Sequence, residues 1–103
     1  MVLVSVMYPN GSGSSFNQDY YLQTHIPLVK DRWKSVGLED VRLVRGVGTP
    51  NGNPPLYQVI ALLTFRSMQD FQRALEANAQ EIFADIPNFT NVEPVVQINE
   101  SFT

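Results

Sequence analysis

The sequence predicts an α+β fold in which a four-stranded antiparallel sheet carries two helices on one face. Three observations predict it: four short segments are rich in β-branched and apolar residues, two segments between them repeat apolar residues at helical spacing, and loops of Pro, Gly, Asn and Ser separate them. The resulting order is βαββαβ, the order of ferredoxin-like folds. Because 103 residues is the usual size of one domain, we expect a single domain over 1–103.

The four strands are expected at 2–8, 40–47, 56–65 and 91–98. The first is a β-branched run that stops at Pro9. A Pro/Gly/Asn loop that contains the turn signal Asn51-Gly52 joins the second strand to the third. Pro94 cannot donate to a strand ladder, so it indicates an irregular or edge position in the last strand.

The first helix is expected to begin near Phe16, because Ser15 and Gln18 have the spacing of a capping box. Pro27 interrupts this helix and should kink it beside His25. The apolar residues that repeat at helical spacing up to Gly37 are Leu22, Ile26, Val29, Trp33 and Val36.

The second helix is expected to begin after Ser67, which has the capping spacing with Asp70. A further short helix is expected over 79–86, and Pro87 should end it.

The first and third strands are apolar on both faces, whereas a half-solvated antiparallel sheet alternates apolar with polar residues. Two helices can cover only one face of such a sheet. We therefore expect the other face to pack against a second copy of the chain, giving a homodimer. One face of these two strands carries Leu3, Met7, Leu56, Ile60 and Leu62, and the other carries Val2, Val4, Val6, Tyr8, Tyr57, Val59, Ala61, Leu63 and Phe65.

Composition argues against several classes of partner. Lys and Arg number 7 against 10 Asp and Glu, a net charge of −3, and this balance disfavours nucleic-acid binding. No apolar run approaches the roughly 20 residues that span a bilayer, so no membrane partner is expected. The chain has no cysteine, and no basic residue precedes the apolar run Val2–Met7 as in a signal peptide, which favours a cytoplasmic location.

His25 is the only histidine, and imidazole is the side chain whose ordinary pKa lies near neutrality. Tyr21 lies four residues earlier and shares its helix face. One hypothesis makes His25 a catalytic acid or base oriented by Tyr21; the other makes it a structural histidine bonded to a backbone carbonyl. A single histidine without a metal-binding spacing, and the lack of a glycine-rich nucleotide loop, predict no metal and no cofactor.

Four further residues are candidates for substrate binding, each with a structural alternative. Tyr20 and Trp33 bring aromatic surface that could serve a ligand, although aromatic residues in such positions more often pack in the core; for Tyr21, also a candidate for substrate binding, the two roles are equally expected. Phe83 either roofs a pocket or caps the end of the sheet. Arg45 alternates with apolar residues in its strand, so it should face the apolar side, where a guanidinium needs a carboxylate or an anionic substrate.

The segment Asp19-Tyr20-Tyr21 followed by His25-Ile26-Pro27-Leu28 resembles the signature of the EthD family, small proteins of the dimeric α/β-barrel group. The resemblance extends along nearly the whole chain, including Phe65-Arg66-Ser67 and the segment 91–97. It implies a ferredoxin-like dimer with a pocket between helix and sheet in each subunit. The wider group includes cofactor-free monooxygenases, polyketide cyclases, a lactone isomerase and haem-binding enzymes.

Together these observations favour a small cofactor-independent enzyme that acts on an apolar or aromatic small molecule by proton transfer at His25. An oxygenase, a cyclase and an isomerase all remain open, so the resemblance is compatible with an oxidoreductase and with an isomerase or lyase. Two alternatives are a haem-binding protein with His25 as axial ligand and a non-catalytic dimer that binds a hydrophobic ligand.

Overall fold

The structure is a computed structural model and describes residues 1–102. Its four strands form one antiparallel sheet in the order β2-β3-β1-β4. This is the ferredoxin-like α+β fold that the element order predicts. The elements are β1 (Val2–Pro9), α1 (Gln18–Tyr20), the π-helical turn η1 (Tyr21–His25), α2 (Ile26–Trp33), the 3-10 turn η2 (Lys34–Val36), β2 (Leu38–Arg45), β3 (Tyr57–Phe65), α3 (Met68–Asp85), the 3-10 turn η3 (Ile86–Asn88) and β4 (Val95–Glu100).

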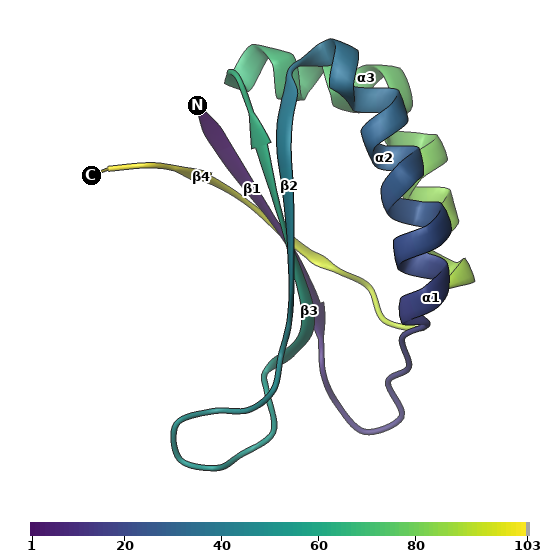
Figure 1. Ribbon diagram of the computed structural model, residues 1–103, viewed down its shortest axis with the longest axis vertical. Helices are drawn as coiled ribbons and strands as arrows, with labels where there is room; N and C mark the ends of the chain where they lie inside the picture. The colour runs from purple at the N-terminus through teal and green to yellow at the C-terminus, as the bar shows by residue number, and fades with distance from the viewer. Residues whose placement is uncertain (103) are drawn as a thin grey trace.

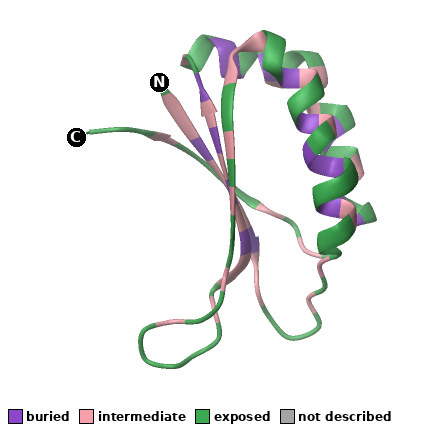
Figure 2. Cartoon of the chain, in the orientation of Figure 1, coloured by how far each residue is buried: buried purple, intermediate pink, exposed green. Residues whose placement is uncertain are grey.

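Helices α2 and α3 lie on the same side of the sheet, and no helix covers the other side (Figure 1). The strand register places Val4 beside Leu63 and Val6 beside Ala61, and these side chains face the helices. Figure 2 shows the buried residues of the helices on the side that faces the sheet. None of the helices within residues 1–102 combines the length and the apolar character needed to cross a bilayer.

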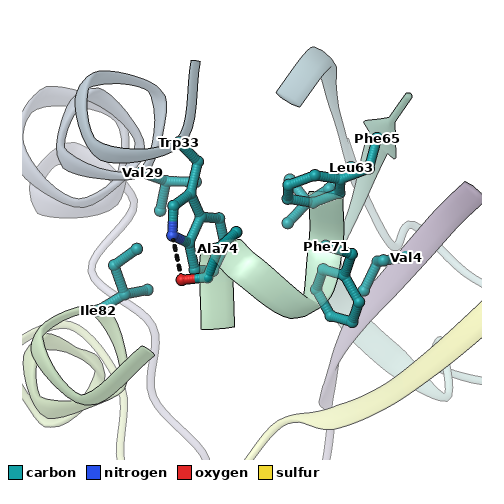
Figure 3. Packing of buried hydrophobic residues seen from close by; sticks show 8 residues of the cluster. All are labelled: Val4, Val29, Trp33, Leu63, Phe65, Phe71, Ala74 and Ile82. Atoms are coloured by element: carbon teal, nitrogen blue, oxygen red, sulfur yellow. Dashed lines mark hydrogen bonds between the residues drawn. The ribbon is translucent and has the colours of Figure 1, made fainter. Parts of the chain in front are cut away.

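One buried cluster joins α2 and α3 to the central strands. Trp33 of α2 is 3% exposed, and its indole N–H donates to the carbonyl oxygen of Ala74 in α3 at 2.9 Å (Figure 3). Val4, Leu63 and Phe65 contribute the sheet side of the cluster. Apolar burial of this kind stabilises a domain by about 25 cal/mol per Å² of apolar surface removed from water.

The first helix begins two residues later than the capping-box spacing predicts. Its N-cap is Asn17, whose side-chain oxygen accepts from the backbone N–H of Tyr20 at 3.1 Å. Ser15 does not cap the helix, because its backbone N–H is bonded to the side chain of Asn91 and Phe16 forms a β-bridge with Thr90. Long-range contacts with residues 90 and 91 thus hold Ser15 and Phe16 outside the helix to which the local pattern assigns them.

The interruption expected at Pro27 takes the form of the π-helical turn η1 directly before it. The backbone N–H of Ile26 bonds the carbonyl of Tyr21, one residue farther back than in an α-helix. Proline has no N–H to continue the ladder and tolerates the start of a helix, so a widened turn followed by α2 accommodates it. The wide turn buries Tyr21 and His25 together.

Two other predicted boundaries are wrong. Residues 79–86 do not form a separate helix: α3 continues without a break to Asp85 and ends where Pro87 imposes the 3-10 turn η3. The last strand begins at Val95 rather than at residue 91, directly after Pro94, which has no N–H for the ladder. The predicted cap of α3 is confirmed, because the Ser67 hydroxyl accepts from the N–H of Asp70 at 3.1 Å.

The face of the sheet without helices, here called the uncovered face, carries an apolar stripe with polar residues around it on central and edge strands. The register places Met7 beside Ile60 on β1 and β3, and Val44 of β2 is also paired with Ile60. Its polar residues include Ser5, Thr64, Gln97 and Asn99. The expected second apolar face is therefore a central stripe that includes Ile60 and Leu62, and Leu56 lies outside it in the loop before β3.

Candidate functional site

A cavity of about 380 Å³ lies between the helix layer and the sheet. It is called the apolar cavity because aliphatic and aromatic side chains make up almost all of its wall. Tyr8, Tyr21 and His25 are the lining residues that carry a hydroxyl group or an imidazole ring. The remaining lining residues are Val4, Val6, Ile26, Val29, Trp33, Ala61, Leu63, Phe71, Leu75, Ile82, Phe83, Ile86, Val96 and Ile98.

Aromatic rings fix the position of His25 in this wall. The imidazole is 4% exposed and stacks on Tyr21, with ring centroids 5.6 Å apart and an angle of 15° between the planes. Phe89, which follows η3, contacts it from another direction at a centroid distance of 4.6 Å. The π-helical turn therefore presents a histidine whose ring is held by packing before any ligand arrives.

The hydrogen-bond partner of His25 is a carboxylate at the end of α3. His25 Nδ1 lies 2.9 Å from Asp85 Oδ2. The other carboxylate oxygen, Oδ1, accepts from the hydroxyl of Tyr20 at 2.6 Å and from the amide of Asn88 at 3.0 Å. Both oxygens of Asp85 are thus occupied, which fixes the carboxylate in the orientation that meets Nδ1.

The electrostatics favour a neutral imidazole beside an ionised carboxylate. Burial lowers the pKa of His25, and the hydrogen bond to Asp85 and the charge of Asp85 oppose this shift only in part. Burial raises the pKa of Asp85, but the hydrogen bonds from Tyr20, Asn88 and His25 outweigh it and lower that pKa overall. An ionised carboxylate only accepts hydrogen bonds, so we assign the proton of the neutral ring to Nδ1.

The second ring nitrogen, Nε2, is the reactive atom of this arrangement. The hydrogen bond of His25 uses Nδ1, and no fully buried side-chain nitrogen or oxygen within residues 1–102 lacks a partner. Nε2 is therefore not sealed inside protein and keeps contact with the cavity that the ring lines. With the proton on Nδ1, Nε2 presents a lone pair to any molecule in that cavity.

Tyr8 and Tyr21 line the same cavity. Their rings meet edge to face with centroids 5.9 Å apart. Burial raises the pKa of both hydroxyls, so both stay protonated at neutral pH. They can act as hydrogen-bond donors, but not as bases.

The arrangement suits proton transfer. Over the described chain, no three His, Asp or Glu side chains lie close enough to hold a metal ion together. A histidine oriented by a carboxylate can accept a proton at Nε2, and the carboxylate then stabilises the imidazolium that forms.

The structure brings most of the predicted site residues to one cavity. Tyr21, Trp33 and Phe83 line it with His25, although the indole N–H of Trp33 is bonded to Ala74. Tyr20 does not line it. Its hydroxyl instead bonds Asp85 from the far side, so Tyr20 supports the carboxylate rather than a ligand.

Arg45 does not approach the apolar cavity. Its side chain is exposed and donates to the amide oxygen of Gln18 at 3.3 Å, and no carboxylate of residues 1–102 pairs with it. The expectation of a carboxylate partner is wrong, because Arg45 lies at the exposed end of β2 beside the start of α1, where an amide and water satisfy the guanidinium.

Sequence reasoning misses Asp85, the residue that orients His25. The two are 60 positions apart, so no local spacing connects them. One signal was available: Asp85 interrupts an apolar series at helical spacing that contains Ile82, Ile86 and Phe89, all buried. A carboxylate on the buried stripe of a helix requires a partner, and a titratable side chain elsewhere is the natural one.

Comparison with known proteins identifies the family and the fold of the chain. A family model described as the EthD domain matches residues 13–93. The chain is similar to the crystal structure of an EthD-like protein from Ralstonia eutropha JMP134, at 32% identity and a TM-score of 0.88, over 96% of this chain and 89% of that one. No curated protein matches the chain.

More distant solved structures share the fold. An ethyl tert-butyl ether d (EthD) family protein from Bacillus halodurans C-125 is 20% identical with a TM-score of 0.78, and the match covers 99% of each chain. HapK from Hahella chejuensis is 10% identical with a TM-score of 0.54, over 100% of this chain and 98% of that one. Since the EthD model spans most of its length, this chain belongs to the EthD domain family.

Proposed function

We propose that the protein is a cofactor-independent enzyme that acts on an apolar small molecule by proton transfer at His25. One observation carries the proposal: the Nδ1 atom of a buried histidine is 2.9 Å from a carboxylate, and the same ring lines an apolar cavity. Catalytic bases need a fixed orientation, and the hydrogen bond to Asp85 and the stacking on Tyr21 supply one for this ring. Asp85 acts as a positioning residue through His25.

The chemical step is removal of a proton from an activated C–H or O–H group. The C–H or O–H bond breaks, its electron pair stays on the substrate as an enolate or a phenolate, and the proton moves to Nε2. The negative charge of Asp85 stabilises the resulting imidazolium, and the dry wall strengthens this interaction. Oxygenases, cyclases and isomerases that work without a cofactor can all begin with such a step.

A second candidate is non-catalytic binding of the same class of molecule. The apolar lining favours it, and so do the hydrogen bonds that occupy both oxygens of Asp85. Both features hold the cavity in one shape whether or not a reaction occurs. Measuring proton transfer directly separates the two.

We also propose a homodimer in which the uncovered faces of two copies pack together. The apolar stripe of Met7, Ile60, Leu62 and Val44 supports it, because no helix shields this stripe within the described chain. Membership of the EthD family supports it as well, since the resemblance implies paired sheets.

The first prediction concerns proton transfer. The wild-type protein should accelerate deuterium exchange at the α-carbon of 2-tetralone in D₂O, followed by proton NMR. His25→Asn keeps an amide donor near the Nδ1 position to bond Asp85 but has no base, so exchange should fall by about 10²-fold or more. Asp19→Asn, on the exposed start of the same helix, is the matched control and should exchange like wild type. Undiminished exchange in His25→Asn would refute a catalytic role for His25.

The second prediction concerns Asp85. In Asp85→Asn the amide can donate to Nδ1, so the ring proton should move to Nε2. Nε2 would then no longer present a lone pair to the cavity. Because the chain has one histidine, long-range ¹H–¹⁵N spectra report this tautomer without ambiguity. We expect the Nδ1–H form in wild type, a shift toward Nε2–H in the variant, and exchange reduced by about tenfold or more. An unchanged tautomer with full exchange would remove Asp85 from the mechanism.

The third prediction concerns pH. The pKa of His25 is lowered from its ordinary 6.5 by burial, so the folded protein binds this proton less readily than the unfolded chain does. Stability should therefore fall as the pH drops from 6.5 toward the folded pKa, and exchange should decline as the pH passes through that value. NMR titration of the one imidazole should give a midpoint below 6.5. His25→Asn should lose this dependence of unfolding on pH; a midpoint at or above 6.5 would contradict the assignment.

The fourth prediction concerns assembly. Sedimentation velocity at micromolar concentration should show a dimer of the wild-type chain. Leu62→Lys places a charge on the apolar stripe and should yield a folded monomer, because an unpaired charge buried between two sheets is strongly unfavourable. Leu22→Lys, at an exposed leucine of η1, is the control and should remain dimeric. A monomeric wild type would exclude the proposed dimer.

A further inference from the structure

We propose that the apolar cavity selects uncharged molecules that carry one oxygen group beside the proton to be removed, and that it rejects carboxylates. The inference deepens the proposed function, on which it rests for the placement of the substrate against Nε2. It is carried by the distribution of charge and polarity around the cavity.

No lysine or arginine contributes to the wall of the cavity as the structure describes it. The charged group nearest to the reactive nitrogen is the carboxylate of Asp85, which bonds Nδ1 on the other side of the same ring. An anion placed at Nε2 would lose its water, meet no cation and be repelled by Asp85. Burying an unpaired charge in an apolar site costs several kcal/mol, so an anionic ligand is excluded where a neutral one is accepted.

The imidazole and the two hydroxyl-bearing side chains of the wall lie close to one another. Tyr8 and Tyr21 belong to one buried cluster, and the ring of His25 stacks on Tyr21. The opposite part of the wall comes from the other cluster and includes Val29, Leu63 and Phe71. A fitting molecule therefore has an apolar body and a single polar end.

The tyrosine pair defines what that polar end is. Both tyrosines line the cavity, Tyr21 stacks on the ring of His25 and Tyr8 contacts Tyr21, so their hydroxyls can donate a hydrogen bond to an acceptor close to that ring. A carbonyl or hydroxyl oxygen of the ligand meets this requirement, and its neighbouring C–H or its own O–H then lies toward Nε2. The substrate class is thus an uncharged apolar ketone, enol or phenol.

The open side of the cavity is apolar, as the entry of an apolar ligand requires. Phe83 of α3 is 44% exposed, and Val96 and Ile98 of β4 are 45% and 49% exposed. All three line the cavity, so its accessible edge offers apolar surface and no charged side chain. A charged residue substituted for Phe83 would therefore lie at the accessible edge of the cavity and should alter its preference between neutral and anionic ligands.

The test compares two probes with the same ring system, 2-naphthol and 2-naphthoate, by NMR titration at pH 7.5. 2-Naphthol should bind the wild-type protein at least about tenfold more tightly than 2-naphthoate, which corresponds to about 1.4 kcal/mol. Phe83→Lys supplies the missing cation at the edge of the cavity and should narrow or reverse this preference. Phe83→Met, which keeps the edge apolar, is the matched control and should preserve it.

Equal or tighter binding of 2-naphthoate to the wild type would overturn the inference, and so would failure of both probes to bind. An unchanged preference for 2-naphthol over 2-naphthoate in Phe83→Lys would also overturn it. The lack of a cation in the wall would then not be the cause of the selectivity. These measurements do not depend on turnover. Selective binding without deuterium exchange would refute the proposed function alone, whereas exchange without charge selection would refute this inference alone.

Discussion

The hydrogen bond between His25 and Asp85 is the constraint on which the candidate site depends. It joins the π-helical turn before α2 to the end of α3, two segments 60 residues apart, at the edge of the buried core. Neither group would be stable there by itself, since an unpaired carboxylate or imidazolium inside a domain is costly. Together, and with Tyr20 and Asn88 on the second carboxylate oxygen, they leave no fully buried polar side-chain atom within residues 1–102 without a partner.

Two irregular turns make this contact possible. The π-helical turn η1 puts Tyr21 and His25 on one buried face, and Pro27 directly follows it at the start of α2. Pro87 ends α3 after Asp85, so η3 brings Asn88 and Phe89 back against the same residues. Both prolines thus mark positions where regular hydrogen bonding stops and side chains of the site are presented, as is common for π-type turns at functional sites.

The site shares its wall with the core, and this links stability to selectivity. Val29, Trp33, Leu63 and Phe71 pack the helices onto the sheet and also line the cavity. Such a wall offers no cation and little hydrogen bonding, so it suits uncharged ligands. The same lack of water keeps the imidazole neutral at pH 7, because burial disfavours its charged form.

The sequence by itself determined the element order and the strand faces, and it singled out the one histidine as a candidate site residue. These follow from period-two and helical repetition of apolar residues, which reflect burial directly, and from the rarity of groups that titrate near neutrality. It did not determine the start of the first helix, the continuity of α3, the surroundings of Arg45 or the role of Asp85. Only the tertiary structure decided these, because contacts between distant segments, such as Ser15 with Asn91 and His25 with Asp85, outweigh local preference and have no fixed spacing along the chain.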